Sequence, residues 1–380
     1  MYIKFNSSKF GTLGLELEVQ TISPRTGELV NGAGIILSQL QGNIMFKPEL
    51  FNSTLEINTP ICENLEELES ALNHNLEIVE KIAKENNLKI LISGCHPFSN
   101  WQYQQITRRE RYQNLLSRIQ WPVRQFLIFG LHVHVGIDDA DKAIYIMNRL
   151  TWYLPHLIAL SASSPFWNGF DTGLATTRIK IFEELPNAGI PYYFDNWDNY
   201  SQLVHQLIKT NSIDTVRDIW WDIRPHPIFG TIEVRICDAM PTLKENLGLT
   251  AMIYSLIRKF DIEFKQNGKI QHVERWILEE NKWRAARYGI MGKIILDNKG
   301  NTRSLKDEVQ SLYEEMVTFG KQQNITYLHD YLKVIPEIID SGPSYLRQRA
   351  WAREKPGDYK YIVNNLLKEK NGNILLNNNK

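Results

Sequence analysis

The chain has 380 residues, of which 43% are hydrophobic and 23% charged, so it is long enough to bury a large core. Lys plus Arg and Asp plus Glu number 43 each, and this balance argues against a nucleic-acid or anionic-membrane partner. The three cysteines, Cys62, Cys95 and Cys237, are too few and too far apart for a disulfide framework or a structural zinc site.

The N-terminal segment lacks the apolar stretch of a signal peptide. No apolar run approaches the ~18 residues that a membrane span needs. The longest candidate, Leu154–Ala162, is short and is interrupted by Pro155 and His156. These features predict a cytoplasmic protein with no membrane partner.

The first half of the chain alternates between strand-like and helix-like segments. Apolar residues at helical spacing predict a helix from about Asn64 to Asn86. Asp141 is expected to cap a helix that runs toward Pro155, where the proline should kink or end it. The strands predicted in this half are Thr12–Ile22, Thr54–Thr59, Lys89–Ser93 and Phe129–Ile137.

In the second half, Gly230–Asp238 is predicted to be the last strand, and the chain beyond it is predicted to be helical. The tail, residues 371–380, is rich in Asn and Lys and is expected to be frayed. No repeat or flexible linker divides the sequence, which favours one α+β domain with a helical C-terminal part. The expected late helices are Leu243–Gln266, His272–Tyr288, Ser304–Gly320 and a weaker one near Tyr327–Ile339.

Four of the predicted strands alternate between aliphatic and polar residues with a period of two. Because successive side chains of a strand point to opposite faces, each strand has one aliphatic face and one polar face. For any single strand a solvated outer face is the ordinary explanation, but such a face should be rich in Thr, Lys and Ser. Here the polar positions carry Glu16, Glu18, Glu56, His132, His134, Glu233 and Arg235.

Placing these strands in one sheet would set several carboxylates side by side. Like charges repel, so the cluster would need cations to be stable. Oxygen-rich ligation with one imidazole suits Mg²⁺ or Mn²⁺ better than Zn²⁺. By themselves, His132 and His134 would more ordinarily be core or surface histidines, and only the neighbouring carboxylates make one of them a candidate ligand.

The sequence contains no Walker A motif, GxxxxGK[ST], and Gly32-Ala33-Gly34 lacks the third glycine of a dinucleotide fingerprint. A nucleotide would therefore have to be held through metal-bridged phosphates and arginines. Arg235 shares a strand face with Glu233, whereas Arg284 and Arg287, three residues apart on a predicted helix, are equally well explained as surface charge. The arginines available for such a role are Arg178, Arg224, Arg235, Arg284 and Arg287.

Eight segments, in order through about residues 12–290, resemble the type 2 glutamate–cysteine ligases, and most closely their bacterial carboxylate–amine ligase branch. The resemblance implies a glutamine-synthetase-like fold, with a curved, mainly antiparallel sheet and helices on its convex side. It also implies a single catalytic domain over residues 1–380, with a helical C-terminal part from about 291 to 370. The segments are TLGLELEVQ, STLEINTPIC, GCHPFSNW, GLHVHVGI, YLPHLIALSASSPFWNG, DTGLATTR, WDIRPHPIFGTIEVRICDAM and ENKWRAARYG.

The resemblance further implies a reaction in which ATP phosphorylates a substrate carboxylate and an amine then displaces the phosphate, forming an amide. Glu233 and Arg235 are the implied catalytic residues, and Arg178, Arg224, Arg235 and Arg284 the implied ATP or substrate contacts. One departure is Asn52, where several family members carry an acidic residue, and Glu49 could substitute for it. The implied ligands of Mg²⁺ or Mn²⁺ are Glu16, Glu18, Glu56, His132 and Glu233.

The implied partners are small molecules: an amino acid or other carboxylate, and an amine. Glutamate and cysteine are the default pair, and a homodimer is left open. Three alternatives stand beside this interpretation: a guanidino-kinase-type phosphotransferase, a metal-dependent hydrolase and a non-catalytic binder. The kinase would yield a stable phosphorylated product, and the hydrolase would need no ATP.

Overall fold

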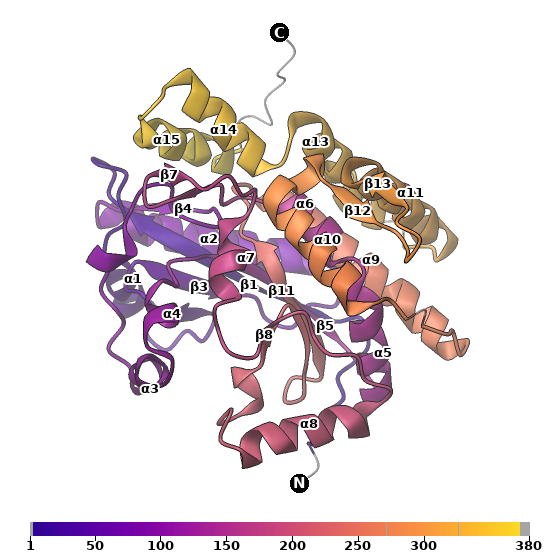
Figure 1. Cartoon of the computed structure of the whole chain (residues 1–380). Coiled ribbons are helices and arrows are strands. Elements are labelled where there is room, and N and C mark those ends of the chain that lie inside the picture. The colour runs from indigo at the N-terminus through magenta and orange to yellow at the C-terminus, as the bar shows by residue number, and fades with distance from the viewer. Residues whose placement is uncertain (1–2, 271, 326, 373–380) are drawn as a thin grey trace.

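A seven-stranded sheet, with every neighbouring pair antiparallel, forms the centre of the computed structural model, which describes residues 3–270, 272–325 and 327–372 (Figure 1). The strand order is β10-β11-β5-β1-β3-β2, and β4 pairs with the last part of β1 beside β5. The strands are β1 Leu13–Ile22, β2 Phe46–Pro48, β3 Thr54–Asn58, β4 Lys89–Leu91, β5 Gly130–Gly136, β10 Ile223–His226 and β11 Thr231–Asp238.

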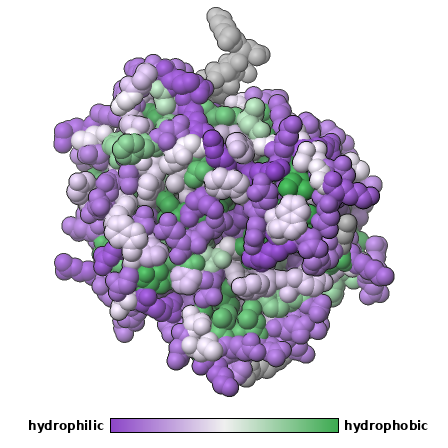
Figure 2. All heavy atoms as spheres, viewed as in Figure 1, coloured by the Kyte–Doolittle hydropathy of each residue, from purple (hydrophilic) through white to green (hydrophobic). Residues whose placement is uncertain are grey.

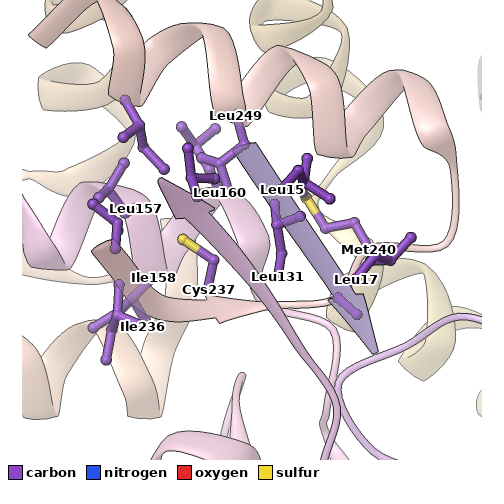
Figure 3. Packing of buried hydrophobic residues seen from close by; sticks show 14 of the residues in the cluster. Leu15, Leu17, Leu131, Leu157, Ile158, Leu160, Ile236, Cys237, Met240 and Leu249 are labelled. Atoms are coloured by element: carbon purple, nitrogen blue, oxygen red, sulfur yellow. The ribbon is translucent and has the colours of Figure 1, made fainter. Parts of the chain in front are cut away.

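The aliphatic face of this sheet is covered by four helices. These are α2 Leu65–Glu85, α5 Ala140–Thr151, α6 Leu154–Ser161 and α9 Leu243–Lys265. Figure 3 shows Leu15 and Leu131 close to leucines of α6 and α9, and Leu17 beside Met240. The predicted burial behind the polar face is confirmed, because Leu15, Leu17, Val133 and Val234 are at most 2% exposed. Burial of this aliphatic face holds the sheet and the helices together.

The remaining helices and short strands surround this two-layer centre. They are α1 Ala33–Gln39, α3 Glu110–Ile119, α4 Trp121–Arg124, β6 Phe166–Trp167, β7 Phe170–Asp171, α7 Thr177–Phe182, β8 Ala188–Gly189, α8 Trp197–Lys209 and β9 Trp220–Trp221, with the 3₁₀ turns Trp101–Tyr103, Val216–Asp218 and Gly289–Met291. The C-terminal part contains α10 Arg275–Tyr288, β12 Lys293–Ile295, β13 Thr302–Ser304, α11 Leu305–Gln322, α12 Leu328–Leu332, α13 Val334–Ser341, α14 Ser344–Glu354 and α15 Tyr359–Lys370.

The structure corrects several expectations about the elements. Residues 230–238 are not the last strand, because the short β12–β13 hairpin follows α10. The helix expected near Tyr327–Ile339 is two helices, α12 and α13, and α14 and α15 were not predicted as separate elements. Most of the tail expected to be frayed lies outside the described residues.

The start of α5 differs from expectation, whereas its end agrees with it. Its N-cap is Asp139, whose carboxylate accepts a hydrogen bond from the Lys142 backbone N–H at 2.8 Å. Asp141 instead accepts from the backbone N–H of Trp197, at 2.8 Å. The helix ends at Thr151, as the proline predicted: Pro155 has no N–H to bond the Thr151 carbonyl, and it lies instead in the first turn of α6, where its missing N–H leaves no intrahelical bond unmade.

The face of the molecule turned to the viewer in Figure 2 is mainly hydrophilic, with apolar side chains in small separate patches. Among the described residues, no helix combines the length and the apolar character needed to cross a membrane.

Candidate active site

The register of the sheet brings the predicted polar side chains together on the face opposite the leucines. Glu16 lies opposite His132 of β5 and Asn58 of β3, and Glu18 lies opposite Glu56. On the other side of β5, Glu233 lies opposite both His134 and Arg224. Directly opposed residues of antiparallel strands share a face. The predicted convergence of Glu16, Glu18, Glu56, His132 and Glu233 is therefore confirmed.

One group of potential cation ligands consists of Glu16, His134 and Glu233, whose ligand atoms all lie within 4.8 Å of one another. The Nε2 atom of His134 is 3.6 Å from Glu16 Oε1 and 3.9 Å from Glu233 Oε1. The other ring nitrogen, Nδ1, is hydrogen-bonded to Thr231 Oγ1 at 3.0 Å, which fixes the ring orientation. Nε2 is buried and makes no hydrogen bond among the described residues. Although burial opposes it, Glu233 and Glu16 raise the pKa of His134, so a cation that binds Nε2 would displace a proton from the ring.

The second group consists of Glu18, Glu49 and Glu56, again with ligand atoms within 4.8 Å of one another. Burial, and then the charges of Glu56 and Glu18, raise the pKa of Glu49 well above its ordinary value. Burial raises the pKa of Glu18 to about 7, although the nearby Arg178 guanidinium opposes this shift. Glu56 is buried and Glu18 and Glu49 are half-buried, so three carboxylates in one place repel one another unless a cation is present, and their oxygens are the ligands that Mg²⁺ prefers.

Glu49 thus lies among the carboxylates, where family members with an acidic residue in place of Asn52 would be expected to put that side chain. The Asn52 side chain is engaged elsewhere, since its Oδ1 accepts a hydrogen bond from the Thr107 hydroxyl at 3.1 Å. Thr107 also donates to the Glu49 backbone carbonyl, at 2.6 Å, which ties the loop that carries Glu49 to the chain before α3.

His132 lies beside the first group rather than within it. Its Nδ1 is 3.1 Å from Glu16 Oε2, and the ring is 3% exposed. Burial and then the Arg235 guanidinium lower the pKa of His132 to about 4, which outweighs the opposing effect of Glu16. The geometry thus favours His134 over His132 as the imidazole ligand, a choice that the sequence left open, and the role of His132 as a ligand stays a prediction.

Glu233 is held by two arginines. Arg224 Nε donates to Glu233 Oε2 at 2.8 Å, and its Nη2 lies 3.3 Å from Oε1. Arg235 Nη1 donates to the same Oε1. Burial disfavours the charged form of Glu233, which is 1% exposed, yet Arg224 and Arg235 hold its pKa well below the ordinary value. Arg235 keeps a buried Nε–H with no partner among the described residues, so it retains a donor for a bound anion.

Arg178 and Arg284, the other two arginines implied as ATP or substrate contacts, occupy different places. Arg178 is 3% exposed and donates to the backbone carbonyls of Arg235, at 3.1 Å, and Ile236, at 3.2 Å, so it supports the strand that carries Arg235. A Cβ at Gly130 would lie 2.1 Å from Arg178 Nη2, which explains a glycine there. Arg284 is not brought to the strand face: its Nε donates to Glu280 at 2.7 Å, and it lines a surface hollow along α10.

Sequence reasoning missed Lys47 and Asn58. Lys47 Nζ lies 3.0 Å from Glu56 Oε1 and 3.0 Å from Asn58 Oδ1, at one end of the carboxylate face. Lys47 belongs to β2, which has only three residues and is too short for a period-two pattern to reveal. Asn58 sits two residues after Glu56, and this spacing within one strand was a signal that could have found it.

Comparison with known proteins agrees with this geometry. The family model described as glutamate-cysteine ligase family 2 matches residues 12–364. The chain belongs to this family. Among its relatives, "Putative glutamate–cysteine ligase 2-1" of Frankia alni is 40% identical over 377 residues, covering 98% of each chain. "Putative glutamate–cysteine ligase 2" of Gloeobacter violaceus is 42% identical over 360 residues, covering 92% of this chain and 94% of the relative.

Two solved structures share the fold of this member of the family. The bifunctional glutathione synthetase of Pasteurella multocida has a TM-score of 0.71 at 15% identity over 94% of this chain, which spans 52% of that larger protein. The glutamate–cysteine ligase of Francisella tularensis, solved in complex with AMP, has a TM-score of 0.69 at 14% identity, covering 96% of this chain and 90% of the other. The predicted α+β, glutamine-synthetase-like fold is confirmed.

Proposed function

We propose that this protein is an ATP-dependent ligase of the glutamate–cysteine ligase type, which joins a carboxylate to an amine through an acyl phosphate. The observation that carries the proposal is the pair of carboxylate-rich groups side by side on one sheet face, bordered by Arg224 and Arg235. The family supplies the reaction class, and the chain acts as a single cytoplasmic catalytic domain.

The donor sets fit Mg²⁺ or Mn²⁺. Glu18, Glu49 and Glu56 offer oxygens alone, and Glu16 and Glu233 add one imidazole, from His134. Bound there, divalent ions would offset the repulsion between the phosphates of ATP and the carboxylate that attacks them. The ligand atoms of Glu16, His134 and Glu233 already lie close together before any reactant binds, so the site needs little reorganisation during the reaction.

Arg235 is the group best placed to act on the transferring phosphoryl group. Its guanidinium is fixed through Nη1 on Glu233, and its Nε–H remains available for a phosphoryl oxygen. Arg224 holds Glu233 from the other side and also donates to the Ile219 carbonyl at 2.7 Å, so it positions the carboxylate and is itself fully engaged. Arg178 supports the backbone of Arg235 by donating to its carbonyl.

The acid and the amine are proposed to be amino-acid-sized molecules, with glutamate and cysteine as the first pair to test, since the relatives carry the name of that reaction. The decisive experiment incubates the purified protein with Mg·ATP and a panel of acids and amines, among them glutamate and cysteine. We expect ADP, inorganic phosphate and an amide in equal amounts, and only when both acid and amine are present.

An isotope experiment tests the acyl phosphate. A carboxylate oxygen labelled with ¹⁸O should appear in the released phosphate, because the oxygen that attacks the γ-phosphorus leaves with it. A stable phosphorylated product without label transfer would indicate a guanidino-kinase-type enzyme. Turnover without ATP would indicate a hydrolase, and amide formation without label transfer would refute the acyl-phosphate route while leaving the ligase assignment intact.

A further inference from the structure

Lys47 places a cation at the edge of the carboxylate face. Its strand, β2, is an edge strand of the sheet, and Lys47 lies directly opposite Glu56. Its Nζ is 3.0 Å from Glu56 Oε1 and 3.0 Å from Asn58 Oδ1. Both acceptor residues are buried, at 7% exposure each, whereas the Lys47 side chain is 50% exposed. The ammonium group of a half-exposed side chain is thus held by oxygens of two buried residues.

The carboxylate that holds Lys47 also belongs to the Glu18–Glu49–Glu56 group. Glu56 Oε1 receives hydrogen bonds from Lys47 Nζ and, at 2.8 Å, from Asn58 Nδ2. A divalent ion that binds Glu56 would neutralise the carboxylate charge and so weaken its attraction for the Lys47 ammonium group. Lys47 and such an ion therefore compete for the same carboxylate.

A lysine is suited to leave this position and to act nearby. Its ammonium is a compact charge with three donors on a flexible four-carbon stem, so it can move by several ångströms while its stem stays on the strand. It also binds phosphate and carboxylate oxygens as a point charge. Arg111 provides a second cation at the same edge: it stacks on Tyr112, 5.8 Å from the ring centroid, and the Tyr112 hydroxyl donates to the Pro48 carbonyl at 2.8 Å.

We propose that Lys47 occupies the place of a divalent cation beside Glu56 in the resting protein, and that it contacts an oxyanion of the reactants once the cation binds. The oxyanion is either the terminal phosphoryl group of ATP or the carboxylate of the acid substrate. Lys47 is then a positioning residue of the reaction. This inference rests on the proposed function and adds a residue that neither the sequence pattern nor the comparisons single out.

The first test measures cation binding without nucleotide. Mn²⁺ is titrated into wild type, Lys47→Met and the control Lys89→Met, and free Mn²⁺ is followed by electron paramagnetic resonance. Lys89 is an exposed lysine on β4 of the same sheet. Removing a positive charge a few ångströms from the ion should tighten Mn²⁺ binding by roughly tenfold in Lys47→Met. Lys89→Met should bind as wild type does, and thermal melts confirm that both variants fold.

The second test identifies the oxyanion. Calorimetry measures the binding of Mg·ATP and, with Mg·ADP present, of L-glutamate, and steady-state kinetics give the KM of each reactant. Lys47→Met should weaken one of them by roughly tenfold or more, namely Mg·ATP if the contact is phosphoryl and L-glutamate if it is carboxylate. A residue that merely supports the fold would weaken Mn²⁺ binding as well and would not tighten it.

Unchanged or weaker Mn²⁺ binding in Lys47→Met overturns the proposal. Unchanged affinity for both Mg·ATP and L-glutamate overturns it too, because the ammonium would then contact neither oxyanion. These outcomes are distinct from failure of the proposed function, in which wild type would form no amide from any acid and amine. Both binding measurements still decide the role of Lys47 in that case, because neither requires turnover.

Discussion

The Glu18→Gln substitution tests the carboxylate face most directly, because it removes one charge with almost no change of volume. Burial raises the pKa of Glu18 from its ordinary 4.5 to about 7 in the folded protein. This shift corresponds to a difference of about 3 kcal/mol in the free energy of unfolding between the protonated and the ionised form. The folded-state pKa is raised, so this stability is fully present below pH 4.5 and is lost as the pH rises through about 7. Metal-free wild type should therefore become less stable between about pH 5 and 8.

In Glu18→Gln that part of the loss should vanish, because glutamine cannot ionise, and the fall in stability over the same pH range should be smaller by up to about 3 kcal/mol. Urea denaturation in EDTA at several pH values measures it. Added Mg²⁺ should restore the stability of wild type at pH 8 but protect the variant less, since a ligand charge is missing. Turnover should fall by orders of magnitude.

The matched control is Glu85→Gln, at an exposed glutamate near the end of α2. It should match wild type in pH dependence, in Mg²⁺ protection and in turnover. If Glu18→Gln shows the same pH dependence and the same Mg²⁺ protection as wild type, Glu18 is not part of a buried carboxylate group that binds a cation. Near-wild-type turnover in the variant would remove it from the mechanism.

Three further predictions follow from the site. Arg235→Lys should lower kcat/KM by about 100-fold or more with no change in folding. The arginine can donate from Nη1 to Glu233 and from Nε to a phosphoryl oxygen at once, and the single ammonium group of lysine cannot reproduce this geometry. Steady-state kinetics and a thermal melt test this, and near-wild-type kcat/KM would contradict it. Glu49→Gln should weaken Mn²⁺ binding whereas Asn52→Ala should not, as titration would show; the reverse result would assign the ligand to Asn52. Arg284→Gln should leave the KM for ATP within about twofold, since Arg284 pairs with Glu280 on α10, and a large rise in KM would restore it to the nucleotide site.

The sequence alone determined which face of each strand is polar. Strand alternation is local, because the direction of each side chain depends only on its position along its own strand. Glu16, Glu18 and Glu56 could therefore be assigned to a polar face without knowledge of the fold. The helix α2 was equally readable, since its apolar spacing and its Asn64 cap are both local.

Which polar residues meet was decided by the register between strands. Opposite pairs such as Glu16–His132 and Glu233–His134 depend on how far β1 and β11 slide along β5, and no single strand specifies this. The pairing register between β11 and β5 also shifts between Val234 and Cys237, and the sequence of neither strand alone predicts this irregularity. The choice of His134 over His132 rests on this long-range pairing.

Contacts made by short segments and distant helices were likewise invisible in the sequence. Lys47 reaches Glu56 from a three-residue strand, whereas Glu49, on the loop that follows it, was anticipated only through the family resemblance. Arg284 carries the right chemistry, but its side chain pairs with Glu280 on α10 and lines a surface hollow along that helix. Residue type and local periodicity can be read directly from the sequence. The distances between segments far apart in the chain are set only by tertiary packing, when burial of the aliphatic face of the sheet brings the layers together.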